Sequence, residues 1–159
     1  MDNEFLGKPA LNPWLFYSGK ISGYIAIAYY GLDILRRPNP ADHVEPFMRV
    51  LSYLFLAAGL ILVLLSLPAL GKSLRFGLPT TETALKTEGL YRYSRNPIYL
   101  GINLISLAAI LGTLNLWVTL LSLFSAVTYH LIIMAEEKFL LERFGEPYRE
   151  YMSRVGRYL

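Results

Sequence analysis

Two short polar segments of the sequence combine residue types that could bind or transfer a charged group. The first, residues 89–101, contains Arg95, Asn96 and Pro97. Asparagine is favoured just before a helix and proline at its first position, so we predict that a helix begins here. A helix start presents free N–H groups and binds anions such as a carboxylate. An ordinary interpretation stays open, in which Asn96 and Pro97 only start a helix and Arg95 anchors at lipid headgroups.

The second segment is the acidic pair Glu136 and Glu137, which ends a long uncharged stretch. Paired carboxylates there could hold an ammonium group or hydroxyls of a ligand, or they could simply mark where a membrane helix becomes solvated. His130 lies seven residues before Glu137, so a helix would bring both side chains to one face. His130 is therefore a candidate substrate-binding residue, although a hydrogen-bonded packing histidine would occupy the same position.

Both polar segments border apolar stretches that are long enough to cross a membrane. No charged residue occurs in residues 50–70, or in the 40 residues from Asn96 to Ala135. A helix needs about 20 apolar residues to cross the bilayer core, so the longer stretch can cross it twice. Residues 112–115, with the sequence GTLN, are typical of a turn and divide this stretch in two.

We predict an all-α, polytopic membrane bundle of about four transmembrane helices, forming a single domain over residues 1–159. The four spans are residues 14–35, 50–70, 97–111 and 116–135, and the last two form a helical hairpin. The first span is interrupted by Lys20 and Asp33, which lie near its ends and are expected to snorkel to the interface. Within it, Gly19 and Gly23 form a small-xxx-small pair, which suggests a homodimer.

An amphipathic tail of two short helices is expected after the fourth span. Gly145 is a plausible end for the first of them and Pro147 a plausible start for the second. The second helix would place four apolar side chains on one face: Tyr148, Tyr151, Met152 and Val155. That face would lie on the membrane surface or pack back on the loop before the third span.

The distribution of basic residues predicts the orientation of the bundle. Ten of them lie in the second loop and in the tail: Lys72, Arg75, Lys86, Arg92, Arg95, Lys138, Arg143, Arg149, Arg154 and Arg157. The positive-inside rule places both segments in the cytoplasm. A net charge of +3 with basic residues beside apolar stretches suits a membrane surface better than nucleic acid. Because cysteine is absent and the two histidines are far apart, we expect no metal site.

Together the two polar segments resemble the integral membrane methyltransferases that include isoprenylcysteine carboxyl methyltransferase and phospholipid N-methyltransferase. The first matching block is residues 89–101, GLYRYSRNPIYLG. The second consists of Glu136 and Glu137, followed by Phe144, Gly145, Tyr148, Tyr151 and Arg157. The resemblance covers about residues 85–159, which would be the catalytic half of the domain.

This resemblance implies S-adenosylmethionine-dependent methyl transfer to a lipophilic acceptor: an isoprenylcysteine-like carboxylate, a lipid amine or a small hydrophobic thiol. The implied catalytic residues are Arg95 and Glu137. The implied cofactor-binding residues are Gly89, Leu90, Tyr91, Arg95, Asn96, Pro97, Tyr99, Glu136 and Glu137. The cofactor carboxylate would lie at Arg95 or at the start of the third span. Its ammonium or ribose would face Glu136 or Glu137. Tyr91 or Tyr99 would face the sulfonium by a cation–π contact.

One residue departs from the pattern of the prenylcysteine enzymes, which usually have histidine where this chain has Asn96. Asparagine does not titrate near neutral pH, which favours the phospholipid-type or a prokaryotic branch of the family. An amine acceptor would also need a base, for which Glu137 and His130 are the candidates. Two other functions remain open. One is an NADPH-dependent membrane reductase, since sterol reductases share a similar C-terminal half, and the other is a non-catalytic membrane scaffold.

Overall fold

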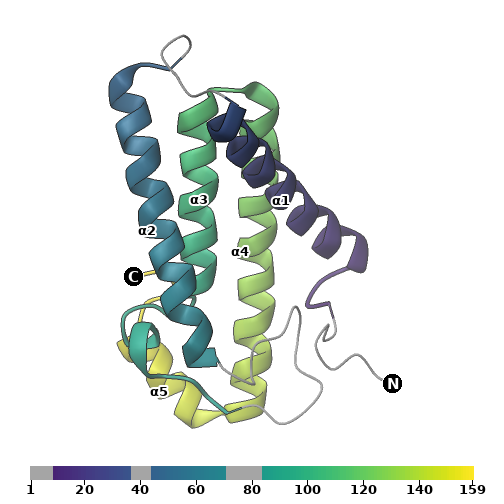
Figure 1. Cartoon of the computed structure of the whole chain (residues 1–159). Coiled ribbons are helices and arrows are strands. Elements are labelled where there is room, and N and C mark those ends of the chain that lie inside the picture. The colour runs from purple at the N-terminus through teal and green to yellow at the C-terminus, as the bar shows by residue number, and fades with distance from the viewer. Residues whose placement is uncertain (1–8, 37–43, 71–83) are drawn as a thin grey trace.

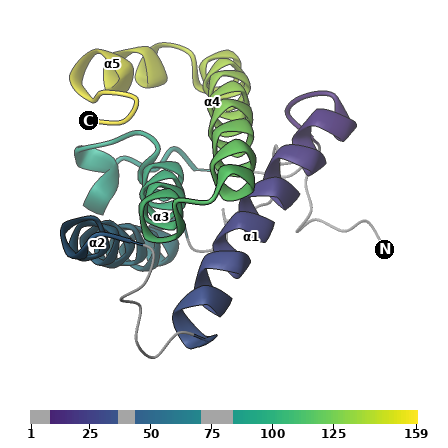
Figure 2. The ribbon, with the colours of Figure 1, turned by 90° about the horizontal axis from the view of Figure 1, so that it is seen from above.

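The computed structural model describes residues 9–36, 44–70 and 84–159, and every regular element in these ranges is helical. The elements are α1 (Pro13–Arg36), α2 (Pro46–Leu70), the short 3₁₀ turn η3 (Gly89–Arg92), α3 (Pro97–Thr113), α4 (Leu116–Phe144) and α5 (Glu146–Arg154). Helices α2, α3 and α4 run side by side, whereas α1 crosses the bundle obliquely (Figures 1 and 2). The predicted all-α fold is therefore confirmed for the described part of the chain.

Helices α3 and α4 form the predicted hairpin, and the turn between them is shorter than residues 112–115. Helix α3 continues through Thr113, and Leu114 ends it in the left-handed conformation, at φ 45°. Asn115 then caps α4, because its side-chain oxygen accepts hydrogen bonds from the backbone N–H of Trp117 at 2.9 Å and of Val118 at 3.2 Å. This tight connection returns the chain to the end of the bundle where α3 began (Figure 1).

Small residues let the helices pack closely in two pairs. Between α2 and α3, a Cβ atom added at Gly59 would lie 2.7 Å from the carbonyl oxygen of Gly101, so only glycine fits there. Between α1 and α4, Gly19 and Gly23 face Thr128 and Ser125 just as closely. The two glycines that suggested a homodimer are thus used within one chain, and the predicted dimer has no support.

The buried core has two parts, one toward the hairpin turn and one toward the opposite end. The first consists of Ala26, Tyr30, Ala108, Ala109 and Val118. The second consists of Phe16, Tyr129 and Ile132, with Tyr99 and Ile102 packed against it. The start of α3 and the acidic pair of α4 both lie near the second part. This part of the core therefore borders the predicted site.

Helix α4 continues well beyond the predicted end of the fourth span. It has 29 residues, which corresponds to a length of about 43 Å, and it carries residues 136–144 as an unbroken extension. The prediction of a separate first tail helix is therefore wrong, because no helix-breaking residue precedes Gly145. Gly145 does end a helix, at φ 58°, but that helix is α4. Pro147 lies in the first turn of α5, as predicted.

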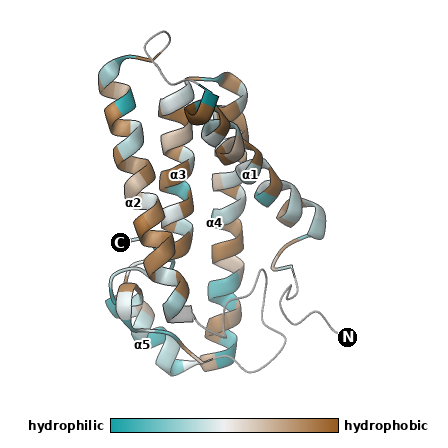
Figure 3. Cartoon of the chain, viewed as in Figure 1, coloured by the Kyte–Doolittle hydropathy of each residue, from teal (hydrophilic) through white to brown (hydrophobic). Residues whose placement is uncertain are grey.

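Two helical segments, Pro46–Pro68 and Leu116–Phe144, are long and apolar enough to cross a membrane. Helix α3 is also apolar but has only 17 residues. Large apolar side chains are exposed on the outer faces, such as Leu64 at 63% and Trp117 at 72%. Figure 3 shows hydrophobic residues along α2 and α3, and more polar ones at the end with α5. Lys72 and Arg75, which contributed to the predicted orientation, lie outside the described residues.

Candidate active site

The end of α4 presents its two consecutive carboxylates to different neighbours. Adjacent helix positions differ by about 100° around the axis, so Glu136 and Glu137 point to separate faces. Glu137 faces the start of α3 and the last residues of the chain. Glu136 faces α3 at Tyr99 and α1 at Lys20. The structure therefore divides a pair that the sequence presents as one unit.

Four donor groups from three side chains hold Glu137, which is 5% exposed. Its Oε1 accepts from Nη2 of Arg95 at 3.2 Å and from Nδ2 of Asn96 at 3.1 Å. Its Oε2 accepts from Nε and Nη2 of Arg157 at 3.0 and 2.8 Å. These four residues are called the Glu137 cluster below. Charge-assisted, bidentate contacts of this kind are among the stronger polar interactions in proteins.

Asn96 occupies the predicted position before α3 but has a different role. Among the described residues, its side chain makes no capping hydrogen bond to α3. Its amide donates instead to Glu137 and, at 3.2 Å, to the carbonyl of Arg157. The expectation of a simple helix cap is thus wrong, because the tertiary partners across the site take up the amide. The first N–H groups of α3 are left without a cap from Asn96.

The last residues of the chain return to the loop before α3. The backbone N–H of Arg95 donates to the carbonyl of Gly156 at 3.0 Å, and Ser94 Oγ donates to the carbonyl of Arg157 at 3.4 Å. His130 Nδ1 lies 2.7 Å from the hydroxyl of Tyr158, and the two rings stack. His130, the predicted substrate-binding residue, therefore faces the end of the chain rather than Glu137.

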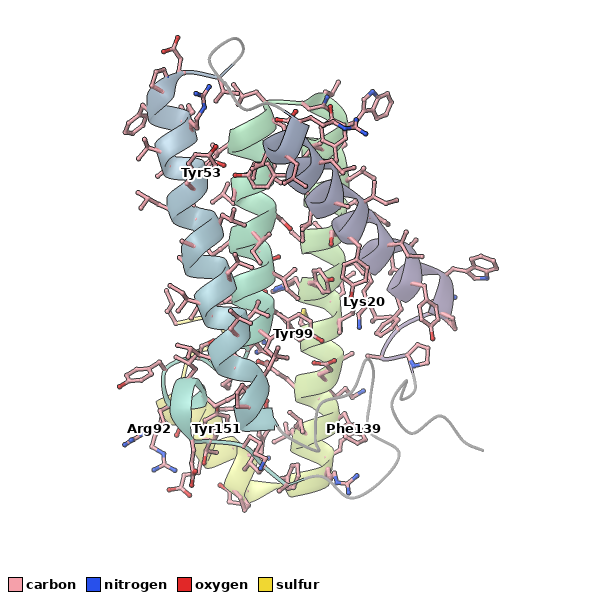
Figure 4. All side chains as sticks on the ribbon, in the orientation of Figure 1. Lys20, Tyr53, Arg92, Tyr99, Phe139 and Tyr151 are labelled. Atoms are coloured by element: carbon pink, nitrogen blue, oxygen red, sulfur yellow. The ribbon has the colours of Figure 1, made fainter. Side chains whose placement is uncertain are left out.

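Glu136 forms a second cluster with Lys20 and Tyr99, called the Glu136 cluster below. The hydroxyl of Tyr99 donates to Oε1 of Glu136 at 2.8 Å. Lys20 interacts electrostatically with Glu136, and its ammonium lies 4.2 Å from the centre of the Phe16 ring. Lys20 is only 8% exposed, so the expectation that it snorkels to the interface is wrong (Figure 4). A lysine inside an apolar span usually indicates an intramembrane partner, and that signal could have identified it.

Helix α5 packs back on the loop before α3. This was one of the two alternatives predicted for the apolar face of the tail. Gly89 has a φ of 61°, a conformation that favours glycine, and it opens the turn η3. The hydroxyl of Tyr151 donates to the carbonyl of Tyr91 at 2.6 Å, and Tyr148 is 1% exposed. Burial raises the pKa of Tyr151 to about 12, so this phenol stays a donor well into the alkaline range.

Arg95 retains one donor that the described residues do not use. Its side chain is 8% exposed, and its Nε is buried without a hydrogen-bond partner among the described residues. A buried unpaired donor costs free energy, so such a group usually marks a place for water or a ligand. Together with the start of α3, this donor can bind an anionic group.

Residues 47–147, more than half of the chain, match the phospholipid methyltransferase family. The chain belongs to this family. A similar protein is methanethiol S-methyltransferase 1 of Bradyrhizobium diazoefficiens, which is 39% identical over 83 residues. That match covers 50% of this chain and only 27% of the relative. The resemblance to membrane methyltransferases is thus confirmed.

The segment of the chain that matches the family contains Arg95, Asn96, Glu136 and Glu137. Lys20 and the C-terminal residues 148–159 lie outside it. The family match therefore includes both glutamates and their partners near α3. The partners Lys20, from α1, and Arg157, from the chain end, are visible only in the structure.

Proposed function

We propose that the chain is an integral membrane methyltransferase that uses S-adenosylmethionine and transfers its methyl group to a lipophilic acceptor. The observation that carries this proposal is the meeting of Arg95 and Asn96 with Glu137 at one end of the bundle. The chain belongs to a methyltransferase family, and these residues lie in the matched segment. Nothing in the comparisons or the described contacts favours the reductase or the scaffold.

The basic side of the site fits the carboxylate of the cofactor. Arg95 offers its unused Nε, and the start of α3 has no side-chain cap from Asn96. Pro97 is buried at the first turn, which keeps this helix start close to Arg95. The two features together provide positive charge and N–H donors, which a carboxylate requires.

The acidic and aromatic side of the site fits the cationic part of the cofactor. Glu136 or Glu137 would face the ammonium or ribose, and Tyr91 or Tyr99 would face the sulfonium. Tyr91 and Tyr99 both interact electrostatically with Glu136, so they lie on the same side of the site. When bound, S-adenosylmethionine supplies an activated methyl group on its sulfonium. The residues named here, with Gly89 and Leu90 of the loop, would align the reactants and exclude water.

The proposed arrangement in the membrane is a single multi-pass domain with its site on the cytoplasmic face. Helices α2 and α4 support two crossings, and α3 lies between them with an apolar surface. Helix α1, the first predicted span, would complete the four crossings and is tilted relative to the others (Figure 2). The basic residues of α5 and of the loop before α3 lie at the same end as the site, in agreement with the positive-inside rule.

The acceptor is proposed to be a lipid amine, a small hydrophobic thiol or an isoprenylcysteine-like carboxylate. The thiol is supported by the name of the similar protein, a methanethiol S-methyltransferase. The lipid amine is supported by the matched family. His130 and Tyr158 would form part of the acceptor side, because they lie two helical turns from Glu137 toward the bilayer.

The first test is calorimetric titration of the protein in lipid nanodiscs with S-adenosylhomocysteine and, separately, with NADPH. We expect binding of S-adenosylhomocysteine, weakened at least about tenfold by Arg95→Ala, since a charged hydrogen bond contributes about 1.5–3 kcal/mol. Arg149→Ala is the matched control, because Arg149 is exposed and pairs only with Glu146 among the described residues. Binding of NADPH alone would support a reductase, and binding of neither would support a scaffold.

The second test identifies the product. The protein is incubated with a methyl-labelled cofactor and a lipid extract supplemented with a short alkyl thiol, and the labelled product is separated and identified. We expect one lipophilic product that is absent with Arg95→Ala. The absence of any labelled product with every acceptor class, despite bound cofactor, would contradict methyl transfer.

A further inference from the structure

The two carboxylates of α4 differ in how strongly their charge is already neutralised. Glu137 is held by two guanidinium groups and one amide, and both of its oxygens accept hydrogen bonds from them. Glu136 has one phenol donor, from Tyr99, and one cation, Lys20, at electrostatic range. Of the two carboxylates, Glu136 is therefore the one available to take up a proton.

The Glu136 cluster adjoins an apolar core. Tyr99 packs against Phe16, Tyr129 and Ile132, which are at most 2% exposed, and the ammonium of Lys20 lies 4.2 Å from the centre of the Phe16 ring. A lysine and a glutamate persist in such surroundings when each compensates the charge of the other. This arrangement costs more to maintain than an apolar contact between α1 and α4, and a purely structural role would not require it.

The two clusters differ in whether the chain end covers them. Arg157 contacts both Asn96 and Glu137, so the chain end covers the Glu137 cluster. The partners of Glu136 come instead from α1 and α3. An acceptor can therefore reach Glu136 without displacing the chain end.

We propose that Glu136 accepts the proton of a proton-bearing lipophilic nucleophile, either a thiol or an amine, and that Lys20 and Tyr99 position its carboxylate. This inference rests on the proposed methyltransferase function. The lone pair of the acceptor sulfur or nitrogen forms the new bond to the methyl carbon. The bond between that carbon and the cofactor sulfur breaks, and its electron pair stays on the sulfur. The acceptor proton passes to Oε2 or Oε1 of Glu136. A carboxylate acceptor has no such proton and would not need this residue.

Several titratable groups face Glu136 and would shape its pH response. Lys20 comes from α1, Tyr99 from α3, Tyr91 from η3 and Tyr148 from α5, while Glu137 is on α4 itself. Lys20 favours the carboxylate form, whereas Glu137 and the burial of the site favour the protonated form. Because Lys20 is the only one of the five that carries a positive charge, its removal tests the positioning role most directly.

The experiment compares Glu136→Gln, Lys20→Met and Tyr99→Phe with the wild-type chain in nanodiscs. Lys138→Met is the matched control, because Lys138 is on the same helix, is exposed and pairs with Glu142. The measurements are binding of S-adenosylhomocysteine, kcat with a short alkyl thiol, with phosphatidylethanolamine and with a farnesylcysteine carboxylate, and the pH profile of kcat. Infrared difference spectra of the cofactor-free protein report the protonation of Glu136 independently of activity.

We expect Glu136→Gln to lower kcat about 100-fold or more with the thiol or the amine, a much larger factor than any weakening of S-adenosylhomocysteine binding. Comparison of the alkyl thiol with phosphatidylethanolamine shows whether the proton comes from a thiol or from an amine. Lys20→Met should move the acid limb of the pH profile, and the infrared carboxyl signal, to higher pH, whereas Lys138→Met should move neither. A weakening of cofactor binding in Glu136→Gln as large as the loss in kcat, retained kcat, or activity with the carboxylate alone would overturn the proposal. Failure of the wild-type chain to bind S-adenosylhomocysteine would instead overturn the methyltransferase function, and this inference with it.

Discussion

The Glu137 cluster and the Glu136 cluster contain neighbouring residues of one helix but differ in the number and the charge of the groups around each carboxylate. Around Glu137, charged groups from three parts of the chain tie the loop before α3, α4 and the chain end together. Around Glu136, one lysine and one tyrosine meet a carboxylate among apolar side chains. The first has many compensating contacts and suits structure and ligand binding. The second has few, and suits a group whose protonation changes during a reaction.

The largest effect on stability is expected at Glu137. Glu137→Gln leaves Arg95 and Arg157 without a countercharge at a site where Arg95 is 8% exposed. Removing one partner of a buried ion pair costs about 3–5 kcal/mol, so we expect a loss near that size. The measurement is the free energy of unfolding in bicelles, with proteolysis of the C-terminal residues as a second readout. Glu142→Gln, at an exposed pair, is the control. Equal stability of the two variants would show that the Glu137 cluster is not an anchor.

A smaller effect is expected at Lys20, together with recovery in a double variant. Lys20→Met leaves Glu136 without its cation, which should cost about 1–3 kcal/mol in the free energy of unfolding. Lys20→Met combined with Glu136→Gln removes both charges and should recover at least half of that loss. A double-mutant cycle in bicelles measures the coupling between the two residues. If the two losses simply add, Lys20 and Glu136 do not act as a pair.

The smallest effect is expected where α5 holds the loop before α3. Tyr151→Phe removes the hydrogen bond to the carbonyl of Tyr91 and should cost about 1 kcal/mol. Burial raises the pKa of Tyr151 from 10.0 to about 12. The protonated phenol therefore contributes its full stability below about pH 10, and this contribution is lost as the pH rises toward 12. Thermal unfolding between pH 9 and 12 should show a larger loss of stability in the wild-type chain than in Tyr151→Phe, which keeps the other buried tyrosines. Tyr93→Phe, at an exposed tyrosine, is the control.

The sequence could predict those features that depend on local pattern. The uncharged stretches predict helices, because burial of apolar residues in a bilayer requires helical hydrogen bonding. The turn between α3 and α4 is predicted by the residue types at 112–115. The motif around Arg95 and the acidic pair predicted two segments that meet, because a hairpin returns its ends to one side. Gly145 and Pro147 were predicted as helix boundaries because their backbone preferences act locally.

Other features could not be predicted, because they depend on which face of a helix meets which neighbour. The sequence predicts a separate helix after Ala135, because charged residues mark where a span leaves the apolar interior. Residues 136–144 instead continue α4, since charged residues are good helix formers. The side chain of Asn96 was expected to cap α3, but its amide donates to Glu137 and to the chain end. Gly19 and Gly23 suggested a second copy of the chain, and α4 of the same chain occupies that face.

The sequence by itself determined the helical class, the family and the two polar segments, since composition, length and motif carry that information. Only the tertiary structure decided that Glu136 and Glu137 have separate partners. The physical reason is that consecutive helix residues point about 100° apart, so their surroundings are set by the packing of α1, α3 and the chain end against α4. Lys20, more than 100 residues before Glu136 in the chain, reaches it only because α1 crosses α4.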